Sequence, residues 1–355
     1  MSEILINHGQ RNEDRGLTIS ILQEINKAQH WIKACNLFFD DLSVKDALLK
    51  AVERGVAIFL LTNLGGTTRR ITINAKTQKK NPDEQTIQAL NHAESLIELN
   101  ELGAHISGLD GLHAKFLLTD SGSGLVTSAN FTHNSTRKIG EIGLKIEEAE
   151  FDELEELFDY IFLRADRVRF KSHGSHFTHE KVMDPLDSDL LPANSRIRMT
   201  LAPTRYSSGF ALSKAHRFDL RDEIFSIIDD TQAGDDLYLL TYSITKRMTG
   251  PGNTTLEKAL KSAQKRGVKI KIVKRGGETE KENDNKKHLY ISGIPFKYHH
   301  DNHAKAIVSS DRGIIFTGNF TDDSMQGGFD IGVVLNDDEI SQAKDFIIRL
   351  INESI

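Results

Sequence analysis

The chain has 355 residues, a single cysteine and a formal net charge of −6. Its length allows two domains with separate cores, and its acidic balance excludes a surface that attracts polyanions through a general basic field. The lone Cys35 excludes an internal disulfide and a thiolate metal cluster, so we expect it to be a buried core residue. Nothing approaches about 18 consecutive apolar residues, and we expect a cytoplasmic protein with no integral membrane association.

Two segments of the chain repeat the same order of helices and strands. Periodicity predicts a helix at 17–28 and a strand at 31–39, and the same pair at 220–230 and 236–244. Residues 44–58 then align without a gap on residues 256–270. Each of these two segments is a helical pattern that ends at a glycine, Gly55 or Gly267, and runs into a strand. The sequence therefore predicts an internal duplication.

The two copies differ in one loop. His113 follows Arg54 by 59 residues, whereas His303 follows Arg266 by 37, so the first copy has 22 additional residues near 65–99. We expect this insertion to become helical at 84–99. Its first part is basic and contains Arg69, Arg70, Lys76, Lys79 and Lys80.

Between the copies lies a segment with three of the chain's six prolines and little apolar periodicity. Such a composition is typical of a connection and not of a packed element, and we interpret it as a linker or a substrate-covering flap. We therefore place a first half at 1–165, the linker or flap at 166–203 and a second half at 204–355.

The sequence His-Ala-Lys occurs once in each copy, at 113–115 and 303–305. Each is followed by an apolar run, an aspartate, a glycine turn and Asn-Phe-Thr. Eleven residues beyond each Asn stands an acid followed by Ile-Gly. Because alternate residues of a strand share a face, the histidine and the lysine of each motif point together. The candidate site residues are His113, Lys115, Asn130 and Glu141 from the first half, and His303, Lys305, Asn319 and Asp330 from the second.

Two histidines and two lysines that converge on one site suit phosphodiester chemistry. One neutral imidazole would attack phosphorus, and the other would protonate the leaving oxygen and then deprotonate water. The lysines and the amides of Asn130 and Asn319 would stabilise charge on the phosphate oxygens, and small neighbours such as Ser128 would let the backbone approach it. Glu141 and Asp330 would each accept a hydrogen bond from the second ring nitrogen of a histidine. No metal or cofactor is needed.

These motifs resemble the signature of the phospholipase D superfamily, H-x-K-x4-D with a downstream Asn, over most of the chain. The resemblance implies an α/β fold, a duplicated phospholipase D-like α/β/α sandwich whose half-domains are related by a pseudo-twofold axis. It also implies metal-independent phosphodiester chemistry through a phosphohistidine. The first motif fits at His113, Lys115 and Asp120, but in the second Asp311 comes one residue late. Since the amino-terminal histidine is usually the nucleophile in this family, the resemblance assigns attack to His113 and acid/base catalysis to His303.

Two further signals have competing interpretations. His299, His300, Asp301 and His303 could form a metal site, but the motif already requires His303, and we favour a polar rim. Phe131 and Phe320 follow the two asparagines, where packing in a core is favoured over stacking on a base.

The motifs do not name the phosphodiester. We favour a nuclease that cleaves DNA or RNA, since the chain has no membrane-binding amphipathic helix and carries basic residues near the expected mouth of the site. The alternatives are a phospholipase or phosphatidyl transferase, and a non-hydrolytic nucleic-acid-binding scaffold subunit. A monomer suffices because both motifs are on one chain, while a partner subunit and a homo-oligomer remain open. The basic residues are Arg69, Arg70, Lys79, Lys80, Arg164, Arg167, Arg169, Lys274 and Arg275.

Overall fold

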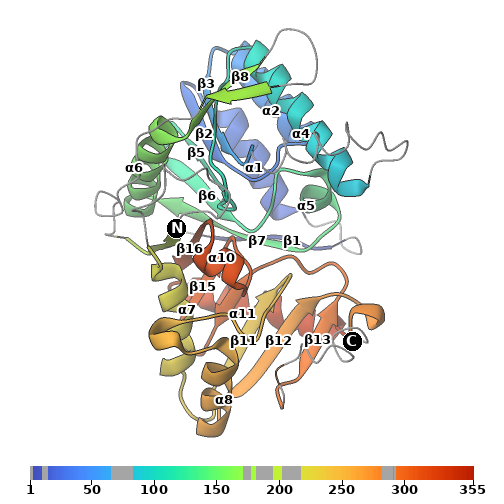
Figure 1. Ribbon diagram of the computed structural model, residues 1–355, viewed down its shortest axis with the longest axis vertical. Coiled ribbons are helices and arrows are strands. Elements are labelled where there is room, and N and C mark those ends of the chain that lie inside the picture. Colours follow the sequence, from blue (N-terminus) through green and yellow to red (C-terminus); the bar gives the residue numbers. More distant parts are fainter. Residues whose placement is uncertain are drawn as a thin grey trace.

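The computed structural model describes residues 3–9, 15–64, 83–170, 177–180, 195–201, 217–281, 291 and 293–355. Its two lobes are stacked in Figure 1, with the first half (blue to green) above the second (yellow to red). The basic part of the predicted insertion lies outside the described residues, namely Arg69, Arg70, Lys76, Lys79 and Lys80.

The sheet of the first lobe has nine strands within the described residues, in the order β1-β7-β6-β5-β2-β3-β4-β8-β9. Strands β2, β3 and β4 are parallel to one another, and the other neighbours are antiparallel. The strands are β1 Ile4–Asn7, β2 Trp31–Cys35, β3 Ala57–Thr62, β4 His105–Gly108, β5 Phe116–Thr119, β6 Ser123–Thr127, β7 Glu141–Glu147, β8 Asp166–Phe170 and β9 Phe177–Glu180.

The sheet of the second lobe has seven strands in its described part, in the order β10-β16-β15-β14-β11-β12-β13. This order and its strand directions repeat the first seven positions of the other sheet. The predicted duplicated α/β fold is therefore confirmed. The strands are β10 Ile197–Leu201, β11 Asp236–Thr241, β12 Lys269–Arg275, β13 Phe296–His299, β14 Ala306–Val308, β15 Gly313–Phe316 and β16 Phe329–Val334.

Helices cover both faces of each sheet. Three cover the outer face of the first sheet, α1 Gly16–Lys27, α2 Leu42–Glu53 and α4 Glu84–Glu101. Two cover the outer face of the second, α7 Asp219–Asp230 and α8 Leu256–Arg266. Two more pack into the core between the sheets, α6 Ala149–Arg164 and α11 Asp337–Glu353. The short elements are α5 His133–Arg137, α10 Asp322–Gln326 and a 3₁₀ turn at Pro251–Asn253. No helix in the described part has both the length and the hydrophobicity of a membrane span.

The predicted helices and strands are present, with shorter strands than expected. The helix of each ungapped alignment ends at a glycine with positive φ, 87° at Gly55 and 98° at Gly267, as predicted. The strand expected at 31–39 ends at Cys35. There Asn36 turns its side chain to the loop after β6, where its amide donates to the carbonyl of Ala129 and its oxygen accepts from the N–H of Phe131.

The segment 166–203, which we expected to be a linker or flap, contributes strands to both sheets. Strands β8 and β9 extend the first sheet beyond β4, and β10 holds the edge position in the second sheet that β1 holds in the first. Strand β10 buries Ile197, Met199 and Leu201, but five residues are too few for their alternation to be distinctive in the sequence. The structural repeat therefore begins before residue 204.

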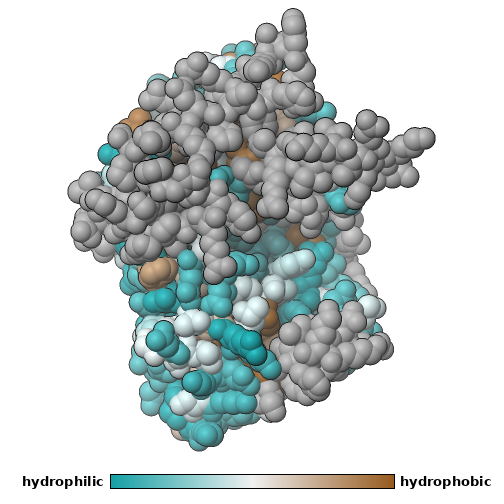
Figure 2. Space-filling view, in the orientation of Figure 1, coloured by the Kyte–Doolittle hydropathy of each residue, from teal (hydrophilic) through white to brown (hydrophobic). Residues whose placement is uncertain are grey.

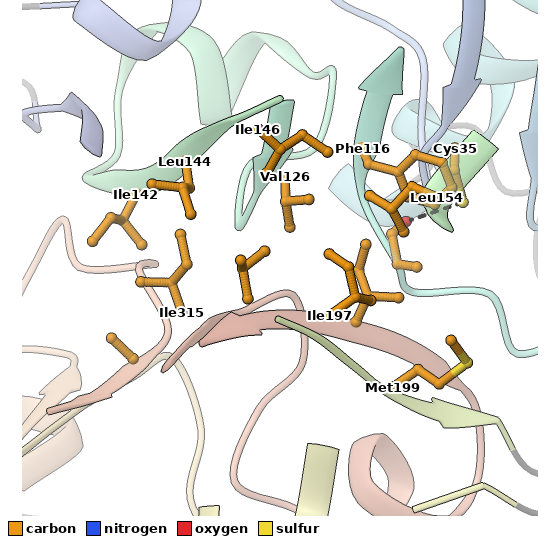
Figure 3. Packing of buried hydrophobic residues seen from close by; sticks show 14 of the residues in the cluster. Cys35, Phe116, Val126, Ile142, Leu144, Ile146, Leu154, Ile197, Met199 and Ile315 are labelled. Carbon is orange, nitrogen blue, oxygen red and sulfur yellow. Dashed lines mark hydrogen bonds between the residues drawn. The ribbon is translucent and has the colours of Figure 1, made fainter. Parts of the chain in front are cut away.

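One apolar core joins the two lobes. Figure 3 shows Val126 and Leu144 of the first sheet facing Ile197 and Ile315 of the second. Cys35 is fully buried in this core, as expected. Phe131 and Phe320 are also fully buried, in the outer cores of their lobes, which confirms packing over base stacking.

The Ile-Gly pair after each acid lies where a helix crosses its sheet closely. A Cβ atom on Gly143 would lie 2.7 Å from Cδ1 of Leu17 on α1, and one on Gly332 would lie 2.9 Å from Cδ1 of Leu220 on α7. The glycines therefore let the helix approach the strand that carries the acid.

Gly143→Ala should lower the free energy of unfolding by about 1–3 kcal/mol, because overpacking forces the helix and strand apart. The measurement is the shift of the urea midpoint. The same substitution in a Leu17→Ala background is the control. Removing the closest methyl group should reduce the additional loss. An unchanged midpoint for Gly143→Ala would contradict the close approach.

Candidate active site

Backbone hydrogen bonds tie the first His-Ala-Lys motif to the second lobe. The N–H groups of His113 and Ala114 both donate to the carbonyl of Phe329, over 2.9 and 2.7 Å. The N–H of Phe329 donates in turn to the carbonyl of Gly111 over 3.0 Å. Since Asp330 follows Phe329, this contact brings the acid of the second lobe to the histidine of the first.

The second motif is tied to the first lobe in the same way. The N–H of His303 donates to the carbonyl of Gly140 over 2.8 Å, and the N–H of Gly140 donates to the carbonyl of Asp301 over 2.6 Å. Glu141 follows Gly140, so the acid of the first lobe meets the histidine of the second. We call these two sets of backbone hydrogen bonds the reciprocal clasp.

Each histidine side chain contacts the carboxylate of the opposite lobe. Nδ1 of His113 lies 2.9 Å from Oδ1 of Asp330, and Nδ1 of His303 lies 2.7 Å from Oε1 of Glu141. Both carboxylates are completely buried. A carboxylate opposite Nδ1 stabilises the tautomer with its proton there and leaves the lone pair on Nε2. On His303 this second nitrogen also has Nζ of Lys305 at 3.3 Å.

A hydroxyl group holds each carboxylate in place. Oγ1 of Thr317 donates to Asp330 over 2.7 Å and accepts the N–H of Ile331 over 3.1 Å. Ser128 makes the equivalent pair of contacts, with Glu141 and with the N–H of Ile142. Sequence reasoning treated Ser128 only as a small neighbour of the phosphate and missed this role. Aligning the copies on their asparagines would have revealed it, because a hydroxyl residue stands two positions earlier in both.

Both motif lysines are completely buried beside the histidines. Nζ of Lys305 lies 2.9 Å from Nδ1 of His303, and Nζ of Lys115 donates to the backbone carbonyl of His113. Burial lowers the pKa of Lys115 to about 8 and that of Lys305 to about 7, although nearby carboxylates oppose the shift. The positive charge of Lys305 is therefore only partly present at neutral pH.

Burial also lowers the pKa of both histidines. For His113 the charge of Lys115 adds to the decrease, and for His303 the pKa falls to about 4 even though Glu141 opposes it. Burial raises the pKa of Glu141, but the charges of His303 and Lys305 and the hydrogen bonds from His303 and Ser128 together outweigh it, and the pKa falls to about 2. We expected one neutral and one protonated histidine. In the free protein both pKa values are lowered, so protonation of either ring depends on the negative charge of a ligand.

The two asparagines occupy equivalent positions after β6 and β15. The side-chain oxygens of Asn130 and Asn319 are buried and have no hydrogen-bond partner in the described part of the chain. Buried polar groups are rarely left unpaired. Since an amide oxygen accepts hydrogen bonds, each of these two atoms has capacity left for a donor group of a ligand.

The aspartate of the motif does not join the site. Asp120 lies at the opposite end of β5 from His113, where its carboxylate accepts the N–H groups of Gln29 and Trp31 over 2.9 and 3.4 Å. In the second lobe Asp311 accepts the hydroxyl of Ser309 over 3.1 Å. Asp120 therefore holds the segment that leads into β2, and Asp311 holds its own turn. Since neither aspartate contacts the motif histidines, the one-residue slip of Asp311 leaves the site unaffected.

The histidines near residue 300, which could have formed a metal site, do not point to a common centre. His303 faces Glu141, while Nε2 of His299 faces Glu353 at 3.4 Å. Across the described ranges, no group of three or more His, Cys, Asp or Glu side chains is placed to hold a metal ion.

Comparison with solved structures places this fold among known ones. Phosphatidylserine synthase from Haemophilus influenzae Rd KW20 is 12% identical, and the match covers 98% of this chain and 86% of that one with a TM-score of 0.60. Polyphosphate kinase from Porphyromonas gingivalis is 13% identical over 99% of this chain and 50% of its own, with a TM-score of 0.54. Nuc from Salmonella typhimurium, a phospholipase D family member, is 17% identical over 48% of this chain and 99% of its own, with a TM-score of 0.36. At these identities the likeness concerns the fold.

A search of curated proteins found no match to the sequence. The family described as "Cardiolipin synthase, PLD-like domain" matches residues 21–162 and 224–348, most of the chain and both lobes. Members of this superfamily are generally phosphoryl-transfer enzymes. The chain belongs to the phospholipase D superfamily, through two copies of its PLD-like domain.

Proposed function

We propose that the protein is a metal-independent phosphodiesterase that cleaves nucleic acid through a phosphohistidine. The observation that carries this proposal is the pair of histidines whose Nδ1 atoms each face a buried carboxylate of the opposite lobe. In this proposal both Nε2 atoms face one phosphate, and the two lysine ammonium groups and the NH2 groups of the two asparagine amides donate hydrogen bonds to its oxygens.

His113 is the proposed nucleophile. Its lowered pKa keeps the imidazole neutral, so Nε2 can form a bond to phosphorus while the bond to the leaving oxygen breaks. His303 donates its proton to that oxygen. The negative charge of the bound phosphodiester raises the pKa of His303 from its low value in the free protein and so supplies the acid form.

Water completes the reaction. Its oxygen bonds to phosphorus as the bond between Nε2 of His113 and phosphorus breaks, and its proton passes to His303. The products are an alcohol and a phosphomonoester, and both histidines return to their starting states. Dividing one displacement into two steps is the advantage of covalent catalysis.

Charge near the site favours nucleic acid as the substrate. Two basic residues add to the two motif lysines. They are Lys274 and Arg275, at the end of β12, and the neighbouring strand β11 ends beside them, just before Tyr242. The visible face of the second lobe in Figure 2 is mainly hydrophilic. A cationic site on a hydrophilic surface suits a charged, water-soluble polymer.

His113→Ala and His303→Ala should each reduce cleavage of single-stranded or double-stranded DNA or RNA in EDTA by about 10²- to 10⁴-fold. His105→Ala is the control, because this histidine on β4 is exposed and its ring stacks on Phe59, outside the candidate site. If His113→Ala and His303→Ala cleaved every substrate as fast as the unmodified protein, the catalytic assignment would be wrong. Headgroup release from vesicles with intact oligonucleotides would indicate a lipase, and salt-sensitive DNA binding without cleavage would indicate a scaffold.

A p-nitrophenyl phosphodiester should separate the two histidines, because its leaving group departs without a proton. His303→Ala should still release a burst of one nitrophenolate per site and retain a phosphorylated histidine, whereas His113→Ala should give no burst. Rapid-quench kinetics measures the burst. The reverse pattern would assign the nucleophile to His303.

Binding of sulfate, whose charge is constant in this range, should weaken as the pH rises. Lys305 loses its charge above pH 7 and Lys115 above pH 8. Above its pKa, each lysine must take up a proton again before it can pair with sulfate, and this lowers the affinity by up to about tenfold per pH unit and per lysine. Isothermal titration calorimetry measures the affinity. In Lys305→Met the decrease just above pH 7 should disappear. The same slope in that variant would exclude Lys305 as its source.

A further inference from the structure

An exposed tyrosine lies directly beside the second histidine. The ring of Tyr242 is edge-on to that of His303, with 5.2 Å between centroids and 65° between planes. The residue is nevertheless 44% exposed, so part of its surface stays open to a ligand. An exposed aromatic surface next to a reacting group is available to the substrate.

Arg275 lies over the ring of Tyr242. Its guanidinium carbon is 5.3 Å from the ring centroid, and β11 and β12 are paired so that Thr241 lies beside Lys274. Tyr242 and Arg275 therefore leave neighbouring parallel strands at the same edge of the sheet. The cation and the aromatic ring form a single feature.

The fold does not require this feature, because the first lobe lacks it. The bridges from Phe39 to Phe131 and from Ile244 to Phe320 are equivalent, which makes Leu37 the counterpart of Tyr242. Continuing the ungapped alignment makes Asn63 the counterpart of Arg275. The pair of an aromatic ring and a cation therefore lies on the His303 side of the described site.

Arg275 also lacks an anionic partner within the described residues. The partner of its guanidinium there is the ring of Tyr242, and its charge contributes to the lowered pKa of Lys305. Two cations close enough to oppose each other destabilise the free site, and an anion bound between them would relieve the repulsion. A guanidinium presents a planar fork that matches a phosphate.

We propose that Tyr242 and Arg275 form a nucleotide subsite, in which a base stacks on the Tyr242 ring and its neighbouring phosphate pairs with Arg275. This inference rests on the proposed nuclease function and adds a position to it. Since His303 protonates the leaving oxygen, the subsite holds the nucleotide that departs first. Stacking accepts any base, so the subsite selects nucleic acid over other phosphodiesters without selecting sequence.

Binding of adenosine monophosphate and of ribose 5-phosphate tests the subsite independently of cleavage. The two ligands share the phosphate and sugar and differ in the base. The unmodified protein should bind the nucleotide about tenfold more tightly, and Tyr242→Ala should bind both equally. Tyr242→Phe should keep the preference, and Tyr160→Ala, which removes a ring paired with Arg164 on α6, is the matched control. Equal affinities in the unmodified protein, or no binding of either ligand, would overturn the proposal.

Oligonucleotides with an abasic residue on the leaving side of one scissile bond test the same subsite during catalysis. Tyr242→Ala should lower kcat/KM about tenfold on the intact strand and leave it unchanged on the abasic strand. A tyrosine that only supports the histidine would affect both strands alike, and that result would refute the subsite.

Salt dependence tests Arg275. In Arg275→Gln, the slope of log affinity for the oligonucleotide against log salt concentration should decrease by about the amount expected for one phosphate contact. If the unmodified protein cuts no oligonucleotide, the nuclease proposal fails and the nucleotide affinities alone decide the subsite.

Discussion

The reciprocal clasp is the interaction on which the site depends. Two backbone segments, each just before an acid, pair with the two segments that begin the His-Ala-Lys motifs of the opposite lobe. Glu141 and Asp330 are completely buried, and a buried carboxylate that loses its partner is strongly destabilising. Separating the lobes would remove the histidine partner of each acid and would expose the apolar core between the sheets. Packing of the lobes and assembly of the site are therefore one event.

The clasp also explains the electrostatics. The lobes close over the motif residues, so both lysines are removed from water and their charge becomes costly. The carboxylates offset only part of this cost, and the pKa values of Lys115 and Lys305 fall to about 8 and about 7. A site with this balance gains most from an incoming anion, which restores the charge of the lysines and promotes protonation of a histidine. In the proposed function, binding and activation of the substrate are thus coupled through the same buried groups.

Much of this arrangement could be predicted from the sequence, because duplication makes local patterns visible twice. The repeated helix that ends at glycine, the strands and the acids eleven residues beyond each asparagine were all apparent in one chain. What the sequence lacked was the relation between the lobes. Which carboxylate meets which histidine depends on how two sheets face each other, and no spacing within one copy contains that information. The hydroxyl residue two positions before each asparagine is a serine in one copy and a threonine in the other, so the repeat of Ser128 and Thr317 is visible only when the copies are aligned on their asparagines. Strand β10 could not be predicted because five residues give too little alternation.

A duplicated site begins symmetric, but the hydrolysis proposed for it needs two histidines with different roles. The first source of asymmetry is the immediate environment, since the side chain of His303 is 15% exposed and that of His113 is 27% exposed, and the ammonium of Lys305 lies against the ring of His303. The second source is the set of neighbouring side chains. The second lobe has an aromatic ring and a cation, Tyr242 and Arg275, where the first lobe has Leu37 and Asn63. Both differences fall on the same lobe. In the proposed reaction, the second copy therefore interacts with the departing group, while the first, whose histidine is more open to a ligand, supplies the nucleophile.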